Sequence, residues 1–286
     1  AYNAAYYENE WENNSNALRI AANETLNIQL LPELNLKSVF SYENNAIKEH
    51  LYYSANHYNG ATSNGEVNEM STTYVKLVSS TTANYHKQFG LHGLDLLAGF
   101  EAEKNNTDFQ RATGTDLPSS ALHSVATAGE LDASAYSWGY NMMSVLSRVA
   151  YNYGQKYNLS ASYRRDGSSR LSPENRWGDF WSVGGAWTIS EESFMDHAAF
   201  ISNLRLRASY GVNGTQPTDN FGWRTLTGYT DRYMGSAGGA INTLGNEALT
   251  WETSYTTNLA LEFGLFDDRL YGMVEYFNRD SRNLLQ

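Results

Sequence analysis

The chain has 286 residues, enough for one large domain or two ordinary ones, and its formal charge of −11 argues against a nucleic-acid partner, which would call for a basic patch. It contains no cysteine, which excludes disulfides and cysteine-ligated zinc. The 21 tyrosines, 23 glycines and only 4 prolines favour an all-β protein, because aromatic residues suit pleated sheets and glycine suits turns. No apolar run approaches the roughly 18 residues of a transmembrane helix.

Apolar and polar residues alternate with period two along most of the chain, a pattern that predicts β-strands with one apolar face. In the first such stretch, Leu18, Ile20 and Leu26 fall on one face, whereas Arg19 and Asn23 fall on the other. The same alternation predicts about ten strands, all antiparallel neighbours, in five pairs. Their expected ranges are 18–30 with 34–42, 75–85 with 94–100, 145–153 with 157–163, 181–189 with 204–210, and 251–263 with 270–276.

The connections between these strands fall into two classes. Short turns close each pair, except that a connector at 190–200 joins the fourth pair, where we expect one helical turn capped by Ser190. Long polar segments separate the pairs, at about 46–70, 104–137, 166–176 and 213–249. Alternating short turns and long loops are typical of outer-membrane β-barrels, whose turns are periplasmic and whose loops are extracellular.

Aromatic residues gather at the strand ends, where a barrel wall would leave the hydrocarbon, and Tyr and Trp favour that boundary. We therefore predict that nine of them lie at the membrane interface. Near the short turns these are Tyr151, Tyr153, Tyr157 and Trp187, and near the long loops Tyr163, Trp181, Tyr210, Trp251 and Tyr255.

Apolar and polar residues would also alternate along the strands of a soluble β-sandwich, whose apolar face is turned inward against a second sheet. Against a sandwich, several expected strands exceed ten residues, which suits a tilted crossing of about 9–11 residues. The polar face also carries charges well inside the strands, among them Arg164, Arg205, Arg207 and Glu262. A water-filled interior tolerates such charges, and we expect their partners to be acidic residues of a plug, with substrate guidance as a second possibility.

Three stretches carry a resemblance to a known family: YRRDGSSRLSPENRWGDFWSVGGAWTISEESFM, ISNLRLRASYGVNG and YGMVEYFNRDSRNLL. In this order and spacing, from about Ser144 to Leu285, the chain resembles the barrel of SusC/RagA-type TonB-dependent outer-membrane transporters of Bacteroidetes. LPELNLKSVFSY and LHGLDLLAGFEAE also look like barrel strands of that family. The resemblance implies a 22-stranded barrel, an amino-terminal plug energised through TonB, a SusD-like lipoprotein lid, and import of oligosaccharides or peptides.

The sequence shows about ten of those 22 strands, with neither a plug nor a TonB-contacting segment. The chain also opens with a polar, tyrosine-rich stretch rather than a signal peptide. We therefore expect residues 1–286 to be a partial barrel domain, taken from a longer protein of the outer membrane of a Gram-negative, Bacteroidetes-like cell. Its TonB contact would then be made through a plug region outside this sequence.

No motif indicates catalysis. A nucleophile elbow, a GxGxxG fingerprint and a P-loop are absent. The six histidines are scattered, and we expect His50 and His57 to be exposed loop residues. Asp166-Gly167 is read as a turn, and the nearby carboxylates are expected in solvent or paired with Arg165, Arg170 and Arg176 rather than around a metal. The sequence therefore predicts a protein that is not an enzyme and that has neither catalytic residues nor a metal or cofactor.

The long segment 213–249 is the best candidate for substrate contact. It carries Trp223, Tyr229 and Tyr233 among Asn, Asp, Thr and Gly, a combination that suits capture of a sugar or a peptide. The alternative is that these aromatics pack the loop onto its neighbours or onto a lid. For the protein as a whole, the alternatives to an importer are a structural or adhesive outer-membrane barrel and a soluble β-sandwich that binds carbohydrate.

Overall fold

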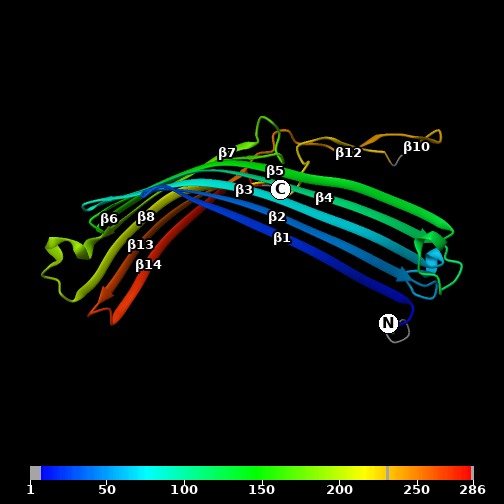
Figure 1. Ribbon diagram of the computed structural model, residues 1–286, viewed down its shortest axis with the longest axis horizontal. Coiled ribbons are helices and arrows are strands. Elements are labelled where there is room, and N and C mark those ends of the chain that lie inside the picture. The colour runs from blue at the N-terminus through cyan, green and yellow to red at the C-terminus, as the bar shows by residue number, and fades with distance from the viewer. Residues whose placement is uncertain (1–7, 230–231, 285–286) are drawn as a thin grey trace. The chain divides into compact units, whose positions relative to one another are not determined.

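The computed structural model describes residues 8–229 and 232–284, and it leaves out the side chains of Tyr233 and Ala237. Ten antiparallel strands form one sheet, in which each strand lies beside its neighbours in the chain (Figure 1). The expected number, order and direction of the strands are thereby confirmed. The strands, in sheet order, are β1 (Trp11–Leu31), β2 (Leu34–Tyr53), β3 (Glu66–Phe89), β4 (His92–Thr115), β5 (Glu130–Tyr153), β6 (Tyr157–Ser168), β7 (Trp177–Thr188), β8 (Ile201–Thr215), β13 (Glu252–Leu265) and β14 (Leu270–Arg282).

The chain divides into two compact units. The first unit holds residues 1–24, 41–78 and 104–139, which are parts of β1–β5 with the connections 54–65 and 116–129. The second unit holds residues 25–40, 79–103 and 140–286, which include β6–β8, β13, β14 and the remaining parts of β1–β5.

The long loops are shorter than the sequence suggested, because the strands continue further. The second strand ends at Tyr53 and the third begins at Glu66, so the expected loop 46–70 shrinks to 54–65. Likewise the expected loop 104–137 shrinks to 116–129, and β3, β4 and β5 each have 24 residues. The polar stretches at these strand ends do not alternate in hydrophobicity, so the pattern that marks a strand is lost there although the backbone pairing continues.

Cross-strand partners in the second unit place the apolar residues on one face of the sheet. Leu206 on β8 lies opposite both Trp187 on β7 and Leu261 on β13, and Leu259 lies opposite Tyr276 on β14. This face is open: Val183 is 50% and Leu259 47% exposed. Among residues 8–229 and 232–284 no second layer of sheet covers these side chains, so the soluble sandwich is wrong for this chain.

The opposite face of the same strands is polar. Arg205 lies opposite Glu262, Ser162 opposite Ser182, and Ser209 opposite Asn258. Because alternate residues of a strand point to opposite faces, Arg164 on β6, Arg205 and Arg207 on β8 and Glu262 on β13 lie on this polar side, whereas Arg165 does not.

Buried apolar side chains form a small cluster in each unit rather than a layer. In the first unit, Tyr52, Val67 and Leu117 pack together. In the second unit, Leu171, Phe180 and Trp251 do so. Both clusters involve the connecting loops, so the loops have a core of their own.

The connector between β7 and β8 contains two short 3-10 turns, η3 (Ile189–Glu191) and η4 (Ser193–Met195), instead of one capped turn. Ser190 lies inside η3, whose N-cap Thr188 makes no side-chain capping bond, so the expected cap was wrong. Glu192 instead accepts hydrogen bonds from Tyr157 and from Nε1 of Trp187, the latter at 3.1 Å. Within the described residues, no helix has the length and apolar character needed to cross a membrane.

The long connection between β8 and β13 has structure of its own. Two short strand pairs are nested in the sequence: β9 (Leu226–Gly228) pairs with β12 (Ala240–Thr243), and between them β10 (Arg232–Tyr233) pairs with β11 (Ser236–Ala237). We call residues 226–229 and 232–244 the loop arm.

Candidate functional site

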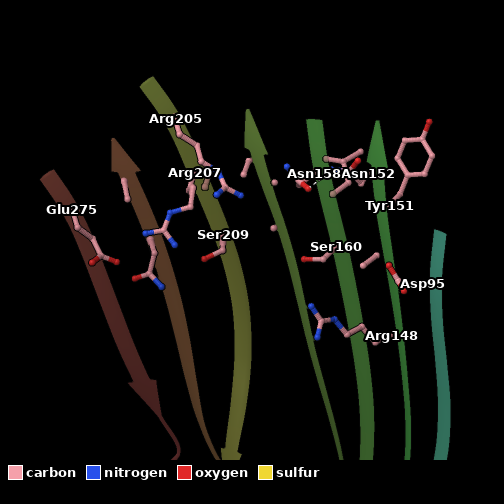
Figure 2. Close-up of a pocket in the computed structure, with 18 residues that line it drawn as sticks. Asp95, Arg148, Tyr151, Asn152, Asn158, Ser160, Arg205, Arg207, Ser209 and Glu275 are labelled. Carbon is pink, nitrogen blue, oxygen red and sulfur yellow. Dashed lines mark hydrogen bonds between the residues drawn. The ribbon is translucent and has the colours of Figure 1, made fainter. Parts of the chain in front are cut away.

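A hollow of about 550 Å³ lies on the polar face of the second unit (Figure 2). Arg205, Arg207 and Ser209 reach into it from β8, and Glu275 approaches from β14. On the other side Arg148 projects from β5. The floor between them is made by small residues, among them Gly184 and Ala186, which leave room for the long side chains around the hollow.

The arginines of this polar face differ in how they are paired. Nη2 of Arg207 lies 2.8 Å from Oε1 of Glu262, its neighbour on β13. Nε of Arg205 is buried and has no hydrogen-bond partner among the described residues. An unpaired buried donor is costly, so the hollow favours an occupant that offers hydrogen-bond acceptors.

Arg164 lies on the same polar face, on β6, but its guanidinium is paired with other residues of the sheet. Its Nη2 is 2.8 Å from Oε2 of Glu101 and 3.0 Å from Oγ of Ser144, and its Nε is 2.6 Å from Oδ1 of Asp166. The partners of Arg164 and Arg207 are thus other residues of the sheet, on β4, β5, β6 and β13, which the sequence analysis did not foresee. That a plug supplies further acidic partners stays a prediction.

A second candidate region is the segment Ser169–Arg176, which joins β6 to β7 and which we call the clamp segment. It makes hydrogen bonds to both ends of the connection 216–251. Near its start, Nε of Arg170 donates to Oδ1 of Asn220 at 2.7 Å. Near its end, Oγ of Ser172 and Nδ2 of Asn175 donate to the Glu247 carbonyl at 3.0 and 2.9 Å. The clamp segment therefore ties together residues far apart in the sequence.

Trp251 belongs to this region and not to the membrane interface, so its expected role was wrong. It is only 5% exposed, and its ring packs edge-on against Phe180 at 5.3 Å. Its Nε1 donates to the Arg176 carbonyl at 3.0 Å. A side chain covered by protein in this way cannot contact lipid. No pattern in the sequence signals this burial, because the covering residues, Leu171 of the clamp segment and Phe180 of β7, lie far away in the chain.

The other aromatics assigned to the interface lie in the second unit, but only some are at strand ends. Tyr153 ends β5 and Tyr157 begins β6, whereas Tyr163 and Trp181 lie well inside β6 and β7. Tyr153, Tyr157, Tyr163, Trp181 and Tyr210 are each between 37% and 42% exposed. Some form pairs: the ring centroids of Tyr157 and Trp187 are 6.5 Å apart, and those of Trp181 and Tyr210 are 5.6 Å apart.

Two residues of the set have additional partners. The hydroxyl of Tyr151 lies 2.6 Å from Nδ1 of His92, and the guanidinium of Arg282 lies 4.6 Å from the ring centre of Tyr255. These positions are compatible with an interface, but its existence at these residues stays a prediction.

The three aromatics assigned to substrate contact have different surroundings. Nε1 of Trp223 donates to the Ser169 carbonyl at 3.3 Å, and the guanidinium of Arg224 lies 4.5 Å from its ring centre, so Trp223 packs the loop onto the clamp segment. Tyr229 follows β9 and is 75% exposed. The side chain of Tyr233 lies outside the described residues.

Histidines of the first unit are less exposed than predicted. His57 is only 4% exposed and stacks on Tyr53 at 4.7 Å, so the expectation of an exposed loop histidine was wrong. Nδ1 of His50 lies 2.7 Å from Oε1 of Glu69. Across residues 8–229 and 232–284, no group of three or more His, Cys, Asp or Glu could hold a metal ion. That the protein needs neither metal nor cofactor stays a prediction.

An antiparallel sheet with one open apolar face and one polar, charged face has the properties of a transmembrane β-barrel wall. Along residues 1–286 the sequence matches the family described as TonB dependent receptor-like, beta-barrel, and the chain belongs to that family. This confirms the resemblance seen in the sequence.

Relatives of known name are similar along most of the chain. TonB-dependent receptor P39 of Formosa agariphila is 29% identical over 271 residues, which are 91% of this chain and 25% of the relative. TonB-dependent receptor SusC of Bacteroides thetaiotaomicron is 28% identical over 242 residues, which are 82% of this chain and 23% of the relative. The chain thus spans about a quarter of these relatives.

Among solved structures, that of the RagAB peptide transporter superposes with a TM-score of 0.86. The match has 25% sequence identity and covers 97% of this chain and 31% of that one.

Proposed function

We propose that this chain forms part of the wall of an outer-membrane importer of SusC/RagA type, which takes up oligosaccharides or peptides by TonB-dependent transport. The observation that carries the proposal is the division of the sheet into two faces. One face is apolar and open, and the other is polar and holds the hollow around Arg148, Arg205 and Arg207. Family membership adds the class of transporter.

The apolar face is assigned to lipid. A strand needs about 9–11 residues to cross the hydrocarbon, whereas β3, β4 and β5 have 24 residues each. Their excess length is therefore assigned to the outside of the cell. The exposed aromatics, such as Tyr157 at the start of β6 and Trp181 further inside β7, are assigned to the two interfaces, where their rings meet hydrocarbon and their polar atoms meet water.

The polar face is assigned to the interior. The unpaired Nε of Arg205 and the open space beside it suit an occupant rich in acceptors, either water, a plug formed by another part of the complete protein, or the substrate in transit. Of the loop aromatics, Tyr229 is the one whose exposed ring suits substrate contact, whereas Trp223 is engaged by the clamp segment.

The partners and the substrate are proposed from similarity. The TonB contact follows from the family, and a SusD-like surface lipoprotein follows from the SusC/RagA resemblance. Peptides are named as the cargo of the RagAB transporter, and this chain is similar to that structure over 97% of its length. In this proposal the protein is a transporter rather than an enzyme.

The test uses the complete receptor in its native host. Deleting its gene should abolish uptake of a subset of labelled oligosaccharides or peptides, and the wild-type gene should restore it. Uptake should also stop when the proton gradient that drives TonB is collapsed. A deletion strain that retains uptake of every compound offered but no longer adheres to surfaces would favour the adhesive alternative and overturn the importer.

A further inference from the structure

Arg170 in the clamp segment makes three different contacts. Its Nε donates to Oδ1 of Asn220 at 2.7 Å, and its Nη1 donates to the Pro217 carbonyl at 3.1 Å. Its guanidinium lies 3.8 Å from the ring centre of Tyr140, which belongs to β5. The side chain thus connects the start of the connection 216–251 to the barrel wall.

The platform beneath Arg170 is itself held in place. The hydroxyl of Tyr140 donates to Oε1 of Glu103 on β4 at 2.9 Å, so the ring is fixed between two strands. The loop side is reinforced by Oγ of Ser168, which donates to Oε1 of Gln216 at 2.7 Å. Contacts therefore run without interruption from the wall, through Arg170, to the first residues of the loop.

Beyond these anchored residues the chain continues into the loop arm, which carries the exposed Tyr229. The direction of the loop arm depends on how the first residues of the connection 216–251 are attached to the barrel wall. We propose that Arg170 is a positioning residue that fixes the start of this loop on Tyr140 and thereby holds the loop arm where it meets substrate. This inference rests on the proposed import function, and it assigns to the clamp segment a role in substrate affinity.

The residue type matters for this role. The planar guanidinium of arginine can stack on an aromatic ring while its N–H groups donate in fixed directions to two acceptors. Lysine has the same charge but is a point donor that cannot make this arrangement. Arg170→Lys should therefore fail to replace arginine, although it preserves the charge.

The experiment uses the complete receptor with Arg170→Gln, Arg170→Lys and Asn220→Ala. Arg165→Gln is the matched control. Arg165 lies on β6, shortly before Arg170, but its guanidinium contacts Asp179 and Trp177 of β7 rather than the loop. Two quantities are measured: the rate of protease cleavage within residues 216–251 of the folded receptor, and the KM and maximal rate of substrate uptake.

We expect cleavage to rise roughly tenfold in Arg170→Gln, Arg170→Lys and Asn220→Ala, because a charge-assisted hydrogen bond to the loop is lost. The uptake KM should rise by a similar factor while the maximal rate changes less than about twofold, and combining Arg170→Gln with Asn220→Ala should add little. The Arg165→Gln receptor should match the wild type in both measurements.

Unchanged cleavage in both Arg170→Gln and Asn220→Ala would overturn the inference. If Arg170→Gln lowers the heat resistance of the barrel, Asn220→Ala decides, because it removes only the loop side of the contact. A higher cleavage rate without any change in KM would also refute the positioning role. Failure of the wild-type receptor itself to take up substrate would instead refute the import function, since the cleavage measurement does not depend on transport.

Discussion

The assignment of the two faces predicts opposite outcomes for neighbouring residues of β8. Leu206 lies on the apolar face between Trp187 and Leu261, whereas Arg205 lies on the polar face opposite Glu262. Arginine at position 206 would enter hydrocarbon near the middle of the strand, which costs about 2–4 kcal/mol. That cost corresponds to a roughly 30- to 1000-fold shift in the unfolding equilibrium.

The reverse substitution, Arg205→Leu, should cost little. Nε of Arg205 has no hydrogen-bond partner among the described residues, and Glu262 keeps its ion pair with Arg207 at 2.8 Å. We therefore expect a change of roughly 0.5 kcal/mol or less, as for substitutions that remove no specific contact.

The assay is urea unfolding of the complete receptor in lipid vesicles, with the heat-dependent mobility of the folded barrel in gels as a second measure. Leu206→Arg should lower the urea midpoint strongly, and Arg205→Leu should leave it almost unchanged. Equal losses in the two variants, or a larger loss in Arg205→Leu, would show that the faces are assigned to the wrong sides.

Two further predictions concern the loops and the turns. Leu171 is 0% exposed between Phe180 and Trp251, so Leu171→Ala should lower the free energy of unfolding by about 2–5 kcal/mol in the same assay. Leu226→Ala is the control, because Leu226 is 37% exposed, and it should cost far less. Similar costs in the two variants would contradict the buried cluster. Hydrogen bonds from Tyr157 and Trp187, with Lys156 nearby, lower the pKa of Glu192 below its ordinary 4.5, so its stabilising contribution is fully present above pH 4.5 and is lost as the pH falls through the lowered pKa. Wild-type receptor should therefore exceed Glu192→Gln in heat resistance near pH 7, and the difference should narrow below pH 4.5; a difference that is the same at all pH values would refute this.

Much of the fold could be predicted from local pattern. The alternation around Leu18 and Ile20, and again around Leu259 and Leu261, marks strands because each must keep one face apolar along its whole crossing. Strand order followed from the short turns, such as Gly154–Lys156, which allow only antiparallel neighbours.

The candidate site was predicted less well, and for a physical reason. Trp223 and Trp251 were identified as aromatics near a loop, but whether an aromatic ring faces lipid, substrate or protein depends on contacts with residues far away in the chain. Trp251 donates to Arg176 and Trp223 to Ser169, across about 75 and 54 positions. Such contacts leave no periodic signal in the sequence.

By itself, then, the sequence determined an antiparallel sheet with one apolar face, the order of its strands and the family of the chain. The sheet and its strand order follow from short-range alternation and short turns, and the family follows from sequence motifs. Tertiary structure alone decided how far the strands continue beyond the alternating region, which charges pair within the wall, and how the clamp segment holds the long loop. Backbone pairing between strands does not require alternating side chains, and contacts between loops are set by three-dimensional proximity rather than by spacing along the chain.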